Sequence, residues 1–93
     1  MITRNEYFNG NVQSLALQGH DQPVTVGVMA KGEYEFGTDA PEVMRVVVGE
    51  LIVKLPESSN WQSFKEGTEF HVPGDSKFHL QVPVDSAYVC VYG

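Results

Sequence analysis

Gly67-Thr-Glu-Phe-His-Val-Pro-Gly-Asp-Ser-Lys-Phe-His79 decides the fold of this chain. A glycine turn leads into a strand of alternating character, the chain reverses at Pro73-Gly74, and a second strand carries a histidine five residues beyond the turn. Small β-barrels deliver polar side chains to their mouth in this way. The stretch therefore predicts a β-barrel and indicates where its site lies, without identifying the chemistry.

The rest of the chain also consists of strand-length segments bounded by turn residues. Nine glycines and five prolines interrupt 93 residues, and this spacing predicts an all-β sandwich or barrel. Residues 57–66 form the longest interval free of both, and we interpret them as a loop with one turn of helix before a short strand at 61–64. Gly49-Glu50 is typical of a type II′ hairpin. We expect the remaining strands at residues 12–17, 24–29, 32–36, 43–48, 51–55, 70–72, 76–82 and 87–92.

Size and composition indicate a single domain covering residues 1–93. A domain this small buries only about two-thirds of its unfolded surface, so an oligomer would add stability. The single cysteine, Cys90, allows no internal disulfide and favours a reducing compartment. It lies in an apolar run, where we expect inert core. The N-terminus does not resemble a signal peptide, and no apolar stretch approaches membrane-spanning length. We therefore expect a cytoplasmic protein without membrane contact.

The charge pattern argues against binding to a nucleic-acid polymer. The net charge is −6, and the six basic residues are scattered singly along the chain. Polymer binding needs a basic stripe, which this sequence lacks. A small anion remains possible, because one or two cations or backbone amides can hold it.

Two motifs are similar to those of the cupins, which are small double-stranded β-helix (jelly-roll) proteins. Glu42 is followed by six residues and Gly49, like the end of the first cupin motif, and the stretch from Gly67 to His79 loosely fits the second. The first motif normally also contains a His-x-His pair, which is absent here. Metal cupins need about three or four ligands, mostly imidazoles, so we expect no metal site. A metal-dependent cupin enzyme and a non-catalytic cupin that binds a sugar or nucleoside remain alternatives.

A closer resemblance covers almost the whole chain, from Asn5 to Tyr92. Short segments resemble the pyrimidine/purine nucleoside phosphorylase family in order and spacing, namely Asn5-Glu-Tyr-Phe8, Val26-Gly-Val-Met29, Gly32-Glu-Tyr34 with Phe36 and Thr38, Pro41-Glu42, Pro73-Gly74 with Ser76, and Phe78-His-Leu-Gln-Val82. The resemblance implies a pentosyltransferase of broad specificity. It would convert purine and pyrimidine nucleosides plus phosphate to free base and (deoxy)ribose 1-phosphate. It also implies a homodimer with no cofactor, inorganic phosphate being the co-substrate.

Phosphorolysis passes through a sugar with positive charge, which a carboxylate can stabilise. The candidates are Glu42 and Glu33. Alternation places Glu33 and Glu35 on one sheet face and Tyr34 and Phe36 on the other, so the acids face either water or the cavity. Tyr34 and Phe36 are candidates to stack on the base.

His79 is the candidate for proton or phosphate handling, because histidine titrates near neutral pH. Simple alternation places it on the solvent face with Lys77, whereas a polar barrel interior would place it inside. For phosphate we expect Ser76 and the amides of its turn, with Arg45 if it faces inward. His71 and Thr38 complete the predicted substrate-binding set. Arg45 and His71 on the outer face are the alternatives.

Overall fold

The computed structural model describes all 93 residues, and β-strands account for most of them. No helix in it has the length and apolar character needed to cross a membrane. The elements, in chain order, are β1 (Thr3–Tyr7), η1 (Phe8–Gly10), β2 (Val12–Leu17), β3 (Val24–Met29), β4 (Gly32–Thr38), β5 (Glu42–Val48), β6 (Glu50–Lys54), β7 (Gln62–Lys65), β8 (Glu69–Val72), β9 (Ser76–Val82) and β10 (Ser86–Tyr92).

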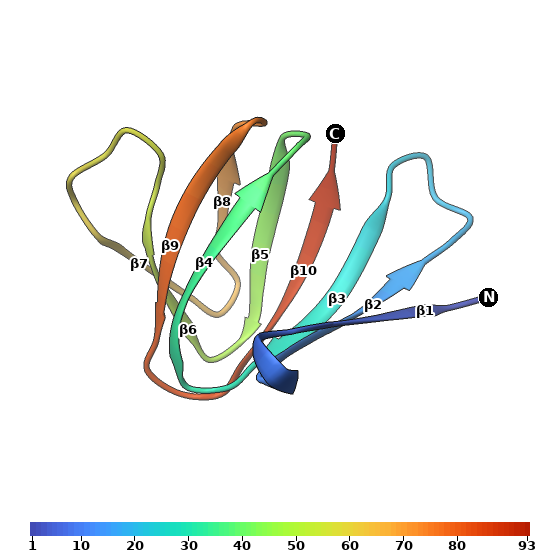
Figure 1. Cartoon of the computed structure of the whole chain (residues 1–93), viewed down its shortest axis with the longest axis horizontal. Helices are drawn as coiled ribbons and strands as arrows, with labels where there is room; N and C mark the ends of the chain where they lie inside the picture. Colours follow the sequence, from blue (N-terminus) through green and yellow to red (C-terminus); the bar gives the residue numbers. More distant parts are fainter.

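Two antiparallel sheets face each other and enclose the core (Figure 1). The larger sheet has the order β1-β2-β3-β10-β5-β8, and the smaller has the order β4-β9-β6-β7. The predicted all-β architecture is therefore confirmed. Residues 57–66 contain turns and strand β7, and the expected turn of helix is absent.

Both turns that the sequence singled out connect the two sheets. The predicted hairpin at Gly49-Glu50 is wrong, because β5 pairs with β10 and β8 while β6 pairs with β7 and β9. Gly49 has a φ of 89°, and a Cβ there would lie 2.2 Å from Ser86 Oγ. Ser86 Oγ accepts a hydrogen bond from the Glu50 amide at 3.1 Å. This glycine thus turns the chain from one sheet to the other. Pro73-Gly74 does the same between β8 and β9.

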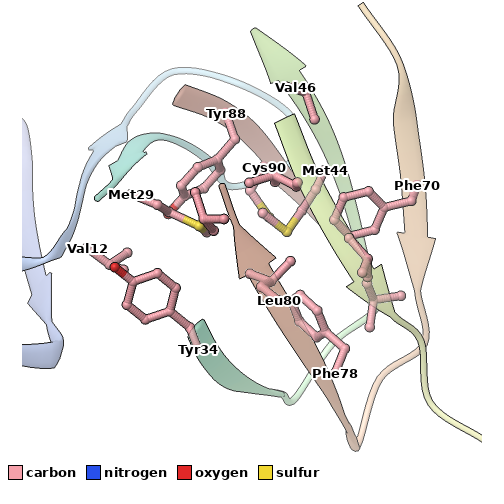
Figure 2. Packing of buried hydrophobic residues seen from close by; sticks show 14 residues of the cluster. Val12, Met29, Tyr34, Met44, Val46, Phe70, Phe78, Leu80, Tyr88 and Cys90 are labelled. Atoms are coloured by element: carbon pink, nitrogen blue, oxygen red, sulfur yellow. The ribbon is translucent and has the colours of Figure 1, made fainter. Parts of the chain in front are cut away.

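The core lies between the inward faces of the sheets (Figure 2). Strand β9 alternates buried Phe78, Leu80 and Val82 with more exposed neighbours, as expected for a sheet with one solvated face. Phe70 and Phe78 meet across the interior with ring centroids 6.3 Å apart. These large side chains fill one end of the sandwich.

The N-terminal strand β1 was not predicted, because its sequence has no apolar alternation. It pairs with β2 in register from Thr3 opposite Ala16 to Tyr7 opposite Val12. The following turn η1 holds Phe8 and Asn9 at φ values of 54° and 57°. This left-handed conformation is uncommon for a bulky residue. It allows Phe8 to reach the aromatic rings of β4, and the ring centroids of Phe8 and Tyr34 lie 5.0 Å apart.

Candidate functional site

A cavity of about 310 Å³ opens between the two sheets at the side of β1 and β4. That volume is at the lower end of the range of ligand pockets, about 300–1,000 Å³. The inward face of the larger sheet supplies most of its wall. The lining residues are Tyr7, Ser14, Met29, Phe36, Gly37, Asp39, Ala40, Glu42, Met44, Phe78, Tyr88, Cys90 and Tyr92. No arginine, lysine or histidine is among them.

Glu42 is the half-buried carboxylate of this cavity. It lies at the start of β5, opposite Tyr92 on β10. Its Oε1 accepts a hydrogen bond from the Cys90 thiol at 3.4 Å. Burial raises the pKa of Glu42, and the bond from Cys90 partly offsets that rise. A carboxylate in such surroundings interacts more strongly with a positive charge than it would in water.

Strand β10 contributes three hydrogen-bond donors to the cavity wall beside Glu42, namely Tyr88, Cys90 and Tyr92. Burial is the main cause that raises the pKa of Tyr88 and of Cys90 to about 12 each. Burial also raises the pKa of Tyr92, whose hydroxyl lies 3.1 Å from Thr25 Oγ1. Both phenols and the thiol are therefore protonated at neutral pH. The phenols can donate hydrogen bonds to a ligand, whereas the single S–H of Cys90 is donated to Glu42.

The position of Tyr88 depends on the absence of a side chain at Gly27, which lies beneath its ring. Gly27 on β3 lies opposite Tyr88, and a Cβ at Gly27 would be 2.4 Å from the Tyr88 ring and hydroxyl. Any side chain there would displace the phenol. The glycine in the middle of an otherwise β-branched strand therefore shapes the cavity wall.

Aromatic rings form the opposite side of the cavity. Phe36 stacks on Phe78 with centroids 5.9 Å apart and an interplanar angle of 27°. Tyr7 meets the edge of Phe36 at 6.3 Å, and Phe8 packs on the same ring at 5.4 Å. The cavity therefore combines an aromatic side, suited to a flat ring, with a side that carries hydroxyls and one carboxylate.

Comparison with known proteins identifies the family. The family model for "Pyrimidine/purine nucleoside phosphorylase" matches residues 2–92. Proteins of that name from Pseudomonas putida strain F1 and Tolumonas auensis are 61% and 58% identical to the chain over 92 residues, which is 99% of the chain and 98% and 99% of those proteins. The chain belongs to this family.

Solved structures agree with the fold. A protein of unknown function from Vibrio parahaemolyticus superposes with a TM-score of 0.96 at 48% identity, over 100% of this chain and 99% of that one. An RmlC-like cupin from Shewanella frigidimarina superposes with a TM-score of 0.77 at 21% identity, over 99% and 81% of the two chains. The predicted cupin-type barrel is confirmed.

Two of the residues predicted for the site line the cavity in this family member, namely Glu42 and Phe36. Tyr34 is buried near Phe36, with ring centroids 6.4 Å apart, and its hydroxyl donates to the Ala30 carbonyl at 2.6 Å. Thr38 and Ser76 join the end of β4 to the turn after β8. Thr38 Oγ1 donates to the Pro73 carbonyl at 2.7 Å and accepts from the Ser76 amide at 3.1 Å.

Two of the turn amides expected to bind phosphate, those of Asp75 and Ser76, are used within the protein. Ser76 donates its amide to Thr38, and its hydroxyl donates to the Gly74 carbonyl at 2.9 Å. The Asp75 amide donates to the Asp39 carbonyl at 3.3 Å. These donors hold the turn against the loop between β4 and β5, and none of the turn residues lines the cavity.

The inward placement considered for His79 is wrong. His79 is exposed on the outer face of the smaller sheet, with Nε2 3.3 Å from Glu35 Oε2. Glu33 is exposed on the same face, two residues before Glu35. Simple alternation was the correct guide here, because β9 buries Phe78 and Leu80 on its inward face and leaves His79 on the other.

Arg45 and His71 lie on the outer face of the larger sheet, which was the alternative left open for them. Both are exposed, and both approach Glu69: Arg45 Nη1 lies 3.6 Å from Glu69 Oε1, and His71 Nε2 lies 3.6 Å from Glu69 Oε2. Neither lines the cavity. No group of three or more His, Cys, Asp or Glu side chains is arranged to hold a metal ion.

Sequence reasoning missed most of the cavity wall. Tyr7, Ser14, Tyr88, Cys90 and Tyr92 were absent from the predicted set, and Cys90 was interpreted as inert core. Cys90 is buried, but it also lines the cavity and binds Glu42. The signal for β10 was the alternation Tyr88, Cys90, Tyr92, which places two phenols and a thiol on one inward face.

Glu42 also makes stability depend on pH in a defined direction. Its pKa in the folded chain is raised above the ordinary value of 4.5, so the folded state binds more protons, and stability falls as pH rises from 4.5 through the folded pKa. We expect Glu42→Gln to raise the melting temperature by a few degrees at neutral pH. Calorimetry should show that this gain disappears at about pH 4. A gain in melting temperature that persists unchanged at that pH would show that the raised pKa of Glu42 is not its cause.

Proposed function

We propose that this protein is a pentosyltransferase of broad specificity, a purine- and pyrimidine-nucleoside phosphorylase. A phosphate oxygen forms a bond to C1′ of the nucleoside as the C1′–N bond breaks. The bonding electrons leave with the base, which takes a proton from phosphate or water. The products are the free base and (deoxy)ribose 1-phosphate.

The observation that carries the proposal is the Glu42 carboxylate within an aromatic cavity. Positive charge develops on the sugar as the bond to the base breaks, and a preorganised carboxylate stabilises it. Phe36 and Tyr7 offer ring faces and edges for a base of either kind. An aromatic ring can stack on either kind of base, because purines and pyrimidines both have flat faces. This supports broad specificity.

Phosphate is expected to bind through neutral donors. The cavity offers the hydroxyls of Ser14, Tyr7, Tyr88 and Tyr92 and contains no basic side chain. Hydrogen bonds between neutral donors and an anion are weaker than those from arginine, and Asp39 and Glu42 add negative charge. We therefore infer that phosphate binds weakly and that the hydroxyls also hold the ribose.

Incubation with a nucleoside in the presence and absence of phosphate tests the activity. We expect uridine and adenosine each to yield free base and pentose 1-phosphate, measured by chromatography, only when phosphate is present. Glu42→Gln protein purified in the same way controls for contaminating phosphorylases. No base, or base released equally without phosphate, would refute phosphorolysis. A melting-temperature shift with uridine but no turnover would favour the non-catalytic binding protein.

We place the reaction in the cytoplasm, without a metal or organic cofactor. The cytoplasmic location rests on the single cysteine of the sequence. Elemental analysis of active protein and assay after EDTA treatment test the metal requirement. Stoichiometric metal together with loss of activity in EDTA would instead favour the metal-dependent cupin enzyme.

A homodimer is the proposed assembly, formed through the outer face of the larger sheet. One row of paired residues crosses this face in the order Arg4, Leu15, Val26, Val89, Arg45. Its centre is apolar and its ends are charged, as in a protein interface with a polar rim. Val28 and Val47 extend the apolar area and are 56% and 48% exposed. A second copy packed face to face would cover it.

Charge placed at the centre of this face should separate the dimer. We expect Val26→Glu to give a monomer in sedimentation experiments, because the dimer would bury two uncompensated carboxylates close to each other. Val84 is exposed to a similar extent, 52% against 40% for Val26, but lies in the loop between β9 and β10. Val84→Glu should therefore leave the dimer intact. A Val26→Glu protein that remains dimeric would place the interface elsewhere.

A further inference from the structure

Cys90 contacts the half-buried carboxylate of the cavity, Glu42. It lies on the inward face of β10, 1% exposed, and its thiol donates to Glu42 Oε1 at 3.4 Å. In the β5–β10 pairing, Met44 is opposite Cys90 and Tyr92 is opposite Glu42. The contact is therefore a diagonal one between neighbouring strands, fixed by the register.

The two oxygens of Glu42 differ in their surroundings. The bond from Cys90 is the one protein hydrogen bond to this carboxylate. No buried side-chain oxygen or nitrogen in the protein lacks a partner. Oε2, which has no protein partner, is consequently accessible. One oxygen is held by the protein, and the other is unpartnered and accessible on a residue that lines the cavity.

We propose that Cys90 is a positioning residue, whose thiol fixes one oxygen of Glu42 and thereby presents the other to the sugar. The catalytic part of this inference rests on the proposed phosphorolysis. A thiol is a weak neutral donor. It orients the carboxylate without neutralising it, whereas arginine or lysine at this position would cancel the charge that the sugar cation needs.

The other titratable groups around Glu42 do not duplicate this role. They come from β1, β8, β10 and the loop between β4 and β5, and they are Tyr7, His71, Tyr88, Tyr92 and Asp39. None of them makes a hydrogen bond to Glu42. His71 lies on the outer face, with Nε2 3.6 Å from Glu69 Oε2.

Titration of Glu42 tests the contact directly. Carbon-13 NMR of the labelled carboxyl group would follow its ionisation in the wild type, Cys90→Ser and Cys90→Val. We expect the pKa of Glu42 to rise in Cys90→Val, because the ionised form loses its donor, and to stay equal or fall in Cys90→Ser, because a hydroxyl also donates. Identical titration in all three proteins would overturn the proposal, whether or not the protein is a phosphorylase.

Kinetics test the consequence for turnover. We expect Cys90→Val to lower kcat on the order of tenfold, with KM within about twofold, and to move the acidic limb of the pH profile upward. In Cys90→Ser, kcat and the acidic limb should stay close to those of the wild type. Val46→Ala, a buried change on β5 away from the cavity, should lower the melting temperature without moving that limb.

An active wild type with an unaltered Cys90→Val profile would refute the positioning role and leave phosphorolysis intact. A wild type without phosphate-dependent turnover would refute phosphorolysis, and the titration would still decide the contact.

Discussion

Glutamine in place of Glu42 is expected to slow nucleoside phosphorolysis by about 10²–10³-fold, the range found when one preorganised electrostatic contact to a transition state is removed. The amide has nearly the shape of the carboxyl group, and its oxygen can still accept the bond from Cys90. The loss is therefore one of charge. Because the sugar is positively charged mainly in the transition state, kcat should fall while KM changes little.

Measurement of kcat and KM for uridine at saturating phosphate checks this result. Glu35→Gln is the matched control, since it removes the same charge from the outer face of the smaller sheet, where Glu35 is exposed beside His79. Its rate should remain within about twofold of the wild type, as for an exposed change remote from the reacting atoms. The rise in melting temperature expected for Glu42→Gln at neutral pH would show that lost activity does not come from unfolding. A Glu42→Gln protein that retains wild-type kcat would exclude the carboxylate from catalysis.

The strands could be predicted because period-2 alternation and turn residues are local signals. Residues 76–82 illustrate this, since alternation places Lys77 and His79 together on the solvent face and both are exposed there. The pairing of strands could not be predicted in the same way. Gly49 supplies a positive φ, which serves equally a hairpin and a crossing between sheets. Its contact with Ser86, distant in the sequence, decides between them.

The candidate site was only partly predictable for a related reason. Glu42 was found because it begins a segment that resembles the end of the first cupin motif, and Phe36 because an aromatic ring can stack on a base. His79 was favoured because imidazole suits proton transfer, but chemistry does not fix the face on which a side chain lies. The cavity wall of Tyr88, Cys90 and Tyr92 resembled ordinary core in sequence. Hydroxyl and thiol groups at the ends of apolar side chains become visible as a site only when the opposite sheet leaves a space above them.

Alanine in place of Phe78 is expected to produce the largest loss of stability. Phe78 is 2% exposed and contacts both Phe36 and Phe70, with centroids 5.9 and 6.3 Å away. Removal of a buried phenylalanine side chain costs about 3–5 kcal/mol. That is a large share of the about 5–15 kcal/mol that stabilises a typical domain.

Thermal unfolding at a fixed protein concentration checks this prediction, because the melting temperature of a dimer depends on concentration. In a domain of this size each kcal/mol corresponds to about 4–8 °C, so the midpoint should fall by more than about 12 °C. Val84→Ala, which shortens an exposed side chain in a loop, should change it by no more than a few degrees. The site should also suffer, since Phe36 loses the ring that holds it against the cavity, and the affinity for nucleoside should decline in protein that remains folded. A midpoint within a few degrees of the wild type would mean that the sheets are not held together by this aromatic cluster, and the cavity wall built upon it would have to be reassigned.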